Sequence, residues 1–270
     1  MSLVGKANGH KETVNALVVR AAGTNCDQET VHALTLAGAT CDVKHVNEIL
    51  TGRIRLHPYQ IVVFPGGFSY GDDIAAGKVL ANELRLRLKD QLQRFVESGK
   101  LVIGICNGFQ VLIKSGLLPG FDTIDSEQLA TLTLNDSARF QCEWVGMATE
   151  KSAASWLEGI PPVFDLPIAH GEGKFITASP KVLATLKKNR QIILRYAPLN
   201  PNGSEAAIAG ICNARGNVVA MMPHPERFVT RFQHPNWPSL PARPNDVGDG
   251  FFFWEKAVAH AKSLSQGVAR

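Results

Sequence analysis

The first half of the chain alternates between strand-length and helix-length patterns of apolar residues. Apolar residues at helical spacing predict helices at residues 27–37, with Asp27 as a cap and Gly38 as the stop, and at residues 80–95, ended by Gly99. Four segments read as short strands, at residues 16–19, 41–46, 59–64 and 101–105. Strands that alternate with helices predict a parallel sheet with helices on both faces, which is a doubly wound α/β fold.

The alternation of strands and helices lapses after residue 120. Helices are predicted at residues 180–188 and 251–263, the second capped by Asp249, and residues 234–250 form a loop rich in proline. The later strand patterns lie at residues 129–134, 140–147, 163–169, 192–196, 206–211 and 218–222. Several of them alternate like antiparallel strands, so the sequence predicts a doubly wound, mostly parallel sheet with an antiparallel extension.

Length and composition fit a single domain. The chain has 270 residues, of which 45% are hydrophobic, and this is enough for one α/β domain with a full core. No internal repeat or domain boundary is visible, so we predict one domain at residues 14–270. Residues 1–13 are polar, lack the apolar stretch of a signal peptide, and are predicted to be a flexible tail.

Charge and cysteine content argue against several classes of function. The net charge of +4 comes from basic residues spread along the chain, which form no basic patch for nucleic acid. The apolar runs have the length of strands, so no membrane span is predicted. The five cysteines include no Cys-x-x-Cys pair, which indicates free thiols, no metal site and a reducing cytoplasm.

The most informative stretch combines a short strand, a cysteine between two glycines and the start of a helix. Cys106 lies between Gly104 and Gly108, which is the spacing of a nucleophile elbow with sulfur in place of oxygen. A helix N-terminus favours thiolate over thiol, and the amide of Asn107 faces the position where an oxyanion would form. Taken alone, the pattern fits a buried structural cysteine equally well.

A candidate base follows the predicted strand at residues 218–222. His224 stands between two prolines that fix its backbone, and Glu226 is close enough in sequence to orient the imidazole. Catalytic groups in open α/β sheets gather at the carboxyl ends of strands, where Cys106 is also predicted. A surface histidine and a solvated acid are the alternative, which the elbow disfavours. A cysteine, a histidine and a carboxylate together indicate an activated thiol nucleophile.

Two adjacent glycines, Gly66 and Gly67, follow the predicted strand at residues 59–64. Such glycines leave backbone N–H groups free to face a ligand, although glycine pairs are also common in plain loops. A second thiol, Cys26, lies in a turn without a glycine elbow or a nearby base. We interpret Cys26 as a small loop residue and not as a nucleophile.

As a set, these segments resemble a known family. Residues 104–110 and 223–226 are similar to the nucleophile and His/Glu segments of the class I, or triad-type, glutamine amidotransferases. Further segments narrow the resemblance to the glutaminase subunits of phosphoribosylformylglycinamidine synthases, from about Val14 to the last helix. They are Gly-Thr-Asn-Cys-Asp at residues 23–27, Phe-Pro-Gly-Gly-Phe-Ser-Tyr-Gly-Asp at 64–72, Leu-Asn-Asp-Ser-Ala-Arg-Phe at 134–140 and Ala-His-Gly-Glu-Gly at 169–173.

The resemblance implies a reaction, which is the hydrolysis of glutamine to glutamate and ammonia through a thioester on Cys106. His224 would give a proton to the departing ammonia and then activate water, while Glu226 keeps the imidazole oriented. These expectations make the three residues a Cys-His-Glu catalytic triad.

The resemblance also implies an oxyanion hole and a glutamine pocket. The oxyanion donors would be the amide of Asn107 and a second amide at Gly67 or Phe68. Gln110 would help to bind glutamine, or it is a polar residue on a helix face. The remaining candidates, which line the glutamine pocket or face a partner and its ammonia entrance, are Arg139, Phe140 and His170. The last of these also fits an ordinary structural histidine. The resemblance also places the loop of Cys26 near the active site, where this residue would have a role in substrate binding or in packing.

The chain has no P-loop, no Gly-x-Gly-x-x-Gly and no other nucleotide-binding signature. An amidine forms from an amide only if the amide oxygen is activated, so the resemblance places ATP and Mg²⁺ on a large synthetase subunit. In some members a small third subunit joins it. Ammonia would pass through protein and convert formylglycinamide ribonucleotide to formylglycinamidine ribonucleotide in purine biosynthesis. We therefore expect no cofactor on this chain.

Two alternatives and one departure from the family pattern stay open. The chain could be another triad-type glutaminase or cysteine hydrolase, against which residues 66–72 and 170–173 argue. It could also be a non-catalytic regulatory subunit, although such proteins usually lose the nucleophile or the base. The proline-rich residues 233–250 look more like members in which glutaminase and synthetase are fused, which leaves the subunit composition open.

Overall fold

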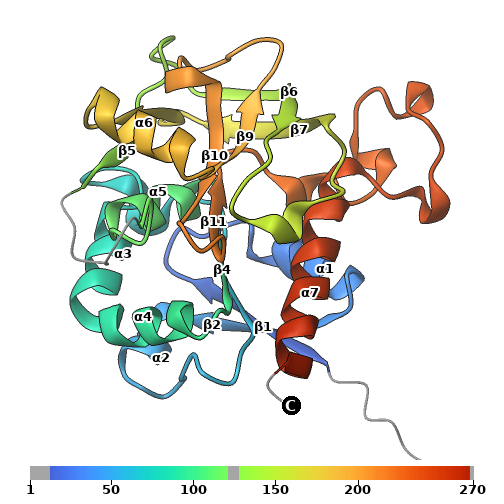
Figure 1. Cartoon of the computed structure of the whole chain (residues 1–270). Helices are drawn as coiled ribbons and strands as arrows, with labels where there is room; N and C mark the ends of the chain where they lie inside the picture. Colours follow the sequence, from blue (N-terminus) through green and yellow to red (C-terminus); the bar gives the residue numbers. More distant parts are fainter. Residues whose placement is uncertain (1–12, 121–127, 268–270) are drawn as a thin grey trace, which may run out of the picture.

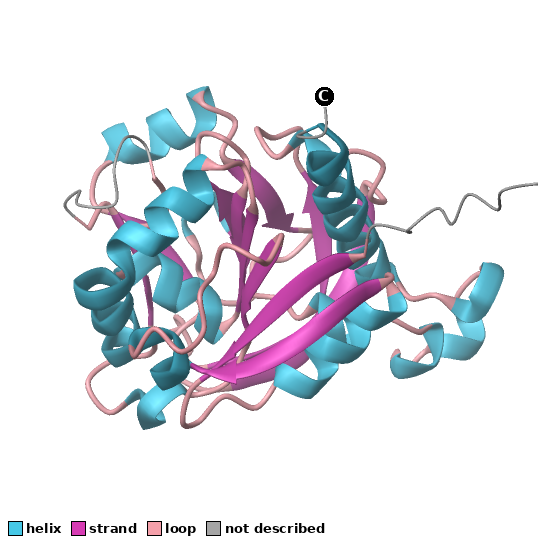
Figure 2. Ribbon diagram, turned by 90° about the horizontal axis from the view of Figure 1, so that it is seen from below, coloured by secondary structure: helices cyan, strands magenta, loops and turns pink. Residues whose placement is uncertain are grey.

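The computed structural model describes residues 13–120 and 128–267. The predicted flexible tail therefore lies, except for its last residue, outside the described residues. A nine-stranded sheet forms the centre of the molecule, in the order β2-β1-β3-β4-β11-β10-β9-β6-β7. Helices cover both faces of the parallel part, with α1 and α7 on one side and α3, α4 and α5 on the other (Figures 1 and 2).

Five parallel strands make up one half of the sheet. They are β1 (Val14–Arg20), β2 (Ala39–His45), β3 (Ile61–Phe64), β4 (Leu101–Ile105) and β11 (Val218–Met221). The three inner strands β3, β4 and β11 are buried along their whole length, because helices exclude water from both faces. Phe64 pairs with Gly104, and Met221 pairs with Ile105, so all three strands end at the same edge.

The other half of the sheet is antiparallel. It contains β10 (Ile208–Cys212), β9 (Ile192–Tyr196), β6 (Gln141–Thr149) and β7 (Val163–His170). A separate two-stranded sheet pairs β5 (Ala130–Thr133) with β8 (Lys174–Thr177). The predicted fold class, a doubly wound and mostly parallel sheet with an antiparallel extension, is confirmed.

Seven α-helices lie among the described residues and surround the sheet. They are α1 (Asp27–Leu36), α2 (Val46–Leu50), α3 (Lys78–Glu83), α4 (Lys89–Glu97), α5 (Asn107–Lys114), α6 (Pro180–Lys188) and α7 (Asp249–Gly267). The predicted capping role of Asp27 is wrong, because Cys26 occupies the N-cap position of α1. Asp27 is the first residue of the helix, and its carboxylate pairs with Arg20 at 3.3 Å.

The long helix predicted at residues 80–95 is interrupted. The four leucines of its stripe are all buried, but a π-helical segment, Leu84–Leu88, separates α3 from α4. The stripe repeats every four residues, whereas an α-helix turns once in 3.6, so a strictly α-helical backbone would rotate the leucines away from the sheet. The wider π turn compensates for this drift and keeps the stripe against the core.

One α-helix and one strand were not predicted. The helix α2 is capped by His45, whose side chain accepts the Asn47 N–H at 3.2 Å and completes a capping box with Glu48. The strand β8 is too short to show a pattern of its own and forms only where it pairs with β5. No helix among the described residues is long and apolar enough to cross a bilayer.

Candidate active site

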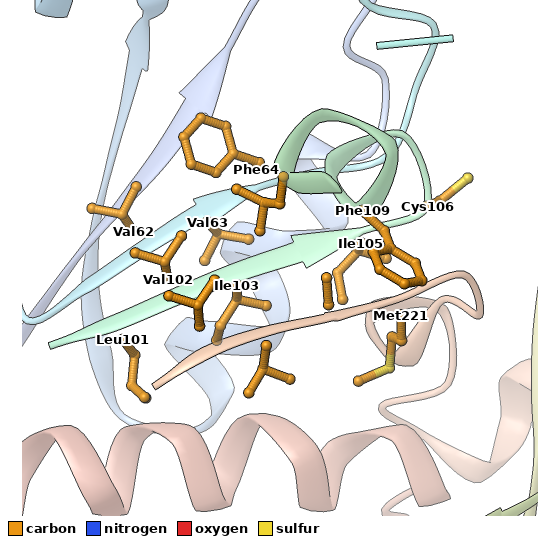
Figure 3. Close-up of a cluster of buried hydrophobic side chains, with 14 of the residues drawn as sticks. Val62, Val63, Phe64, Leu101, Val102, Ile103, Ile105, Cys106, Phe109 and Met221 are labelled. Carbon is orange, nitrogen blue, oxygen red and sulfur yellow. The ribbon is translucent and has the colours of Figure 1, made fainter. Parts of the chain in front are cut away.

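Cys106 occupies a sharp turn between β4 and α5, at the end of a cluster of buried apolar side chains (Figure 3). Its backbone has φ 52° and ψ −105°, a conformation that non-glycine residues rarely adopt and that functional sites often contain. A Cβ on Gly108 would lie 1.9 Å from the carbonyl oxygen of Phe64, so only glycine allows α5 to approach β3 this closely. This geometry is that of a nucleophile elbow.

The thiol of Cys106 is held but not enclosed. The Cys106 N–H donates to the Met221 carbonyl at 2.8 Å, which anchors the turn to β11. The side chain is 5% exposed, and its sulfur lies 3.6 Å from the Ala169 carbonyl at the end of β7. In Figure 3 the sulfur is directed away from the apolar cluster, so the core supports the residue and leaves its thiol at a surface cavity.

His224 follows β11 by three residues and is buried together with Glu226. Its Nδ1 lies 2.6 Å from Oε1 of Glu226, and its backbone N–H donates to the Pro167 carbonyl at 2.9 Å. Because the carboxylate accepts a hydrogen bond from Nδ1–H, the acceptor atom of the neutral ring is Nε2. Nε2 has no hydrogen-bond partner among the described residues, which leaves it available to a reacting group.

The electrostatics of His224 favour its protonated form. Burial alone would lower the pKa of His224, but the negative charges of Glu226 and Cys106 outweigh burial and hold this pKa well above its usual range. A protonated imidazole next to a thiolate is the resting state expected of a cysteine–histidine pair. It can donate a proton to a leaving group without first acquiring one.

A second thiol, Cys26, also contacts the His224 ring, which the residues around Cys26 in the sequence do not indicate. Its sulfur lies 3.9 Å from Nδ1 of His224 and accepts a hydrogen bond from the Arg227 guanidinium at 3.0 Å. Cys26, His224 and Glu226 place potential metal ligands within 4.8 Å of one another. The guanidinium on the same sulfur disfavours a metal ion there, because its positive charge would repel the cation.

The two predicted positions for the second oxyanion donor differ in their hydrogen bonds. The Phe68 N–H donates to the Gly23 carbonyl at 2.9 Å and is therefore already used. The Gly67 N–H has no backbone acceptor among the described residues, and neither has the Asn107 N–H at the first position of α5. The two free amides belong to segments that follow adjacent strands, β3 and β4.

A cavity of about 180 Å³ lies at the thiol. Five of the predicted site residues line it, namely Gly67, Phe68, Gln110, Phe140 and His170, in addition to Cys106. Arg139 is exposed and is not among the lining residues. Larger hollows of about 430 and 460 Å³ lie elsewhere and contain no cysteine–histidine pair, so chemistry and not size identifies the site.

Gln110 ties the nucleophile helix to the opposite wall of the cavity. Its Nε2 donates to the Glu172 carbonyl at 2.8 Å, and its Oε1 accepts from Nδ2 of Asn107 at 2.9 Å. Asn107 in turn accepts the Ser69 N–H at 3.1 Å and donates to Asp72 at 3.2 Å. These bonds give both amide side chains a role in holding the loops around the thiol, beside any contact with substrate.

His170 is a buried neutral acceptor. Asn135 donates its amide N–H to the Arg139 and His170 carbonyls, so its Oδ1 must be the acceptor of the Gly173 N–H and of Nδ1 of His170. Nδ1 therefore carries the proton, and Nε2, which has no partner among the described residues, is an acceptor. Burial, assisted by the charge of His224, lowers the pKa of His170 to about 4.

Comparison with known proteins agrees with this geometry. The model of the CobB/CobQ-like glutamine amidotransferase domain matches residues 13–261. The PurQ subunit of phosphoribosylformylglycinamidine synthase from Dehalococcoides mccartyi is 45% identical over 262 residues, which cover 93% of this chain and 99% of the relative. The PurQ subunit from Treponema denticola is 44% identical over 237 residues, or 79% of this chain and 88% of the relative.

A solved structure of a related protein also matches this chain over most of its length. A chain in the structure of PurLQS from Thermotoga maritima is 30% identical, has a TM-score of 0.71, and aligns over 92% of this chain and 99% of its own length. The matches thus extend over nearly the whole domain and include both halves of the sheet. The chain belongs to the CobB/CobQ-like glutamine amidotransferases, within the family of PurQ subunits of phosphoribosylformylglycinamidine synthase.

Proposed function

We propose that this chain hydrolyses glutamine with a Cys106–His224–Glu226 triad and delivers the ammonia to a synthetase subunit. The observation that carries the proposal is the nucleophile elbow at Cys106 together with the buried His224–Glu226 pair, whose ring and carboxylate are 2.6 Å apart. A degenerate subunit would have no reason to keep a strained thiol and a buried ion pair, both of which cost stability.

In the first half-reaction the Cys106 thiolate attacks the side-chain carbonyl carbon of glutamine. The carbonyl oxygen becomes an oxyanion, stabilised by the N–H groups of Asn107 and Gly67, which have no backbone acceptor among the described residues. The intermediate collapses when the C–N bond breaks and His224 gives its proton to the departing nitrogen. Ammonia leaves, and the glutamyl group remains on Cys106 as a thioester.

In the second half-reaction His224, now neutral, takes a proton from a water molecule. The resulting hydroxide attacks the thioester carbonyl, the same two amides stabilise the oxyanion, and the C–S bond breaks to release the side-chain carboxylic acid, which loses its proton to solvent and becomes glutamate. The thiolate of Cys106 and the protonated form of His224 are thereby restored. Glu226 keeps Nδ1 protonated throughout, so Nε2 is always the nitrogen that exchanges the catalytic proton.

The acceptor chemistry belongs to the partner. We assign ATP and Mg²⁺ to a large synthetase subunit, which would use the ammonia to convert formylglycinamide ribonucleotide to formylglycinamidine ribonucleotide. The related chain from Thermotoga maritima supports an assembly of this kind, since the name PurLQS joins L, Q and S components. We further propose a small third subunit as an additional component, a cytoplasmic location for the complex, and no cofactor on this chain.

The decisive experiment separates the two nitrogen sources in the reconstituted complex. Cys106→Ala should abolish amidine formation with glutamine, by a factor of about 10³ or more, and leave the reaction with added ammonium unchanged. Equal loss with both sources would show that Cys106 supports the complex and not the glutaminase step. Cys142→Ala, an exposed cysteine on β6, is the matched control.

A further inference from the structure

The thiol of Cys26 lies next to the base of the proposed triad, yet it has no part in the reaction described above. Its sulfur is 3.9 Å from Nδ1 of His224. The residue is 1% exposed and is not among those that line the cavity at Cys106. A substrate in that cavity does not reach the sulfur, so any effect of Cys26 on the reaction must pass through His224.

The sulfur of Cys26 is held in place by side-chain hydrogen bonds. It donates its S–H to Oδ1 of Asn25 at 3.1 Å and accepts a hydrogen bond from the Arg227 guanidinium at 3.0 Å. The backbone N–H of Cys26 donates to the Gly66 carbonyl at 3.2 Å. A buried cysteine that only fills space behaves as a small apolar group and needs no such partners. The position of this sulfur is therefore defined on several sides.

The imidazole ring of His224, in contrast, has a single hydrogen-bonded tether. Nδ1 lies 2.6 Å from Oε1 of Glu226, while Nε2 of the ring and Oε2 of Glu226 have no partner among the described residues. The edge of the ring at Nδ1 and Cε1 packs against Gly66 and Cys26. A Cβ on Gly66 would lie 2.7 Å from Cε1 of His224 and 3.0 Å from the Cys26 sulfur, so these groups leave no room for one more carbon.

Arg227 links the sulfur back to the residue that the sulfur supports. Its backbone N–H donates to the His224 carbonyl at 3.2 Å, and its guanidinium donates to the sulfur of Cys26. The turn Pro225–Arg227 thus carries both the acid that orients the ring and the cation that holds the sulfur. The contacts form a closed circuit between the loop after β1 and the loop after β11.

We propose that Cys26 is a positioning residue for the base: together with Arg227 it fixes the imidazole of His224, so that Nε2 stays directed at Cys106 and at the departing nitrogen. The inference rests on the proposed glutaminase function and adds to it a residue that does not touch the substrate. Both half-reactions transfer a proton through Nε2, and a misplacement of about 1 Å can lower a rate by about 100-fold. Substrate binding does not depend on the ring, so kcat should change and KM should not.

The test replaces the thiol and measures glutamate release by the reconstituted complex. In Cys26→Ala we expect kcat for glutamine to fall about 10- to 100-fold, with KM within about threefold and the reaction with added ammonium within about twofold. Cys26→Ser keeps a donor and an acceptor in nearly the same space, and should retain kcat within about fivefold of the wild type. An unchanged kcat in Cys26→Ala, a higher KM alone, or an equal loss with ammonium would overturn the inference.

Cys212→Ala is the matched control, because this free cysteine of β10 is also fully buried and loses the same atom. Both alanine variants should lower the melting temperature, since each leaves a small cavity. Cys212→Ala should nevertheless keep kcat within about twofold of the wild type. If the two variants lower kcat by the same factor, the loss reflects stability and the inference is wrong.

Arg227→Gln examines the same circuit from its other side, and it decides the question if Cys26→Ala does not fold. It should lower kcat about 3- to 10-fold, and an unchanged kcat would count against the inference. The double variant with Cys26→Ala should be no slower than Cys26→Ala alone, because residues that act through one contact are not additive. Effects that multiply would show that the two residues act independently, contrary to the proposal. If the wild-type complex releases no glutamate from glutamine, the proposed function fails instead.

Discussion

At the scale of single residues, the reactivity of Cys106 follows from its surroundings and not from its exposure. Its side chain is 5% exposed, whereas Cys142 on β6 is exposed to solvent. Reaction with iodoacetamide depends on the thiolate, and Cys106 lies at the N-terminus of α5, close to His224 and at a surface cavity. We predict that brief treatment at neutral pH modifies Cys106 faster than any other thiol, as measured by mass mapping. Faster labelling of Cys142 or Cys26 would contradict the assignment.

The charge of Glu226 should set the alkaline limit of activity. Burial lowers the pKa of His224, but Glu226 and Cys106 raise it by more than burial lowers it. The imidazole therefore stays protonated at a higher pH than an ordinary histidine. Glu226→Gln removes one of the two negative charges and must lower this pKa. We predict that the alkaline limb of the kcat/KM profile for glutamine moves to lower pH by about one unit or more. An unchanged alkaline limb would mean that another group controls it.

The same residue pair makes a pH-dependent contribution to stability, and its sign can be stated. A histidine whose pKa is higher in the folded than in the unfolded chain stabilises the fold fully below the unfolded value, and this stabilisation is lost as pH rises through the folded value. Glu226→Gln should therefore lower the free energy of unfolding most at acidic to neutral pH, near or below the ordinary histidine pKa. Denaturant unfolding at several pH values measures this difference.

At the scale of elements, the elbow depends on how closely α5 approaches β3. Gly108→Ala should destabilise the protein by about 2–3 kcal/mol, although alanine is the better helix former, because its Cβ would lie 1.9 Å from the Phe64 carbonyl oxygen. Gly171→Ala is the matched control, since the nearest atom to its Cβ would be a Phe140 ring carbon at 3.9 Å. Thermal unfolding should separate the two variants, and equal melting temperatures would refute the proposed constraint.

The elements also show what the sequence can and cannot predict. The parallel strands, the elbow and the His224–Glu226 pair are local signals, because periodicity, glycine spacing and neighbouring residues encode them within short stretches. The π segment at Leu84–Leu88 and the strand β8 depend on packing against distant residues, and no local pattern reveals them. The two acids that line the cavity, Asp72 and Glu172, lie far apart in sequence, so only the folded chain brings them to the thiol.

The contact of Cys26 with His224 is a clear example of this limit. Cys26 follows β1 and His224 follows β11, and the two residues are separated by 198 positions. Nothing near Cys26 in the sequence indicates a base, so we interpreted it as a loop residue. In the sheet, β3 and β4 lie between β1 and β11. The loop after β3 brings Gly66 next to both residues, since a Cβ on Gly66 would lie 3.0 Å from the Cys26 sulfur and 2.7 Å from the His224 ring.

At the scale of the whole molecule, the site lies between the carboxyl ends of the parallel strands and the end of β7, the outermost antiparallel strand. The parallel half provides the nucleophile and the base, while the end of β7 in the antiparallel half provides the wall from Ala169 to Glu172. The backbone N–H of His224 donates to the Pro167 carbonyl, and this hydrogen bond joins the base to β7.

This arrangement leads to a prediction about regulation: the isolated chain should be a poor glutaminase that its synthetase partner activates. The loop that provides the Gly67 amide continues into Tyr70, Gly71 and Asp72, which all have positive φ angles of 54° to 71°. Positive φ at the two non-glycine residues costs about 1–3 kcal/mol each, and a displacement of the loop would release this strain. Phe68 and Ile74, on either side, are 45% and 74% exposed and offer a partner an apolar contact.

An oxyanion donor contributes only if it is in place before the reaction, and its loss costs roughly 3–4 kcal/mol, on the order of a hundredfold or more in rate. Glutamate release should therefore rise by about this factor when synthetase, acceptor substrate and nucleotide are added to the chain. Ile74→Asp should reduce the activation and leave the low activity of the isolated chain unchanged, because Ile74 does not line the cavity. A chain that hydrolyses glutamine alone at the full rate of the complex would show that the loop is already fixed. The partner would then act only as a receiver of ammonia.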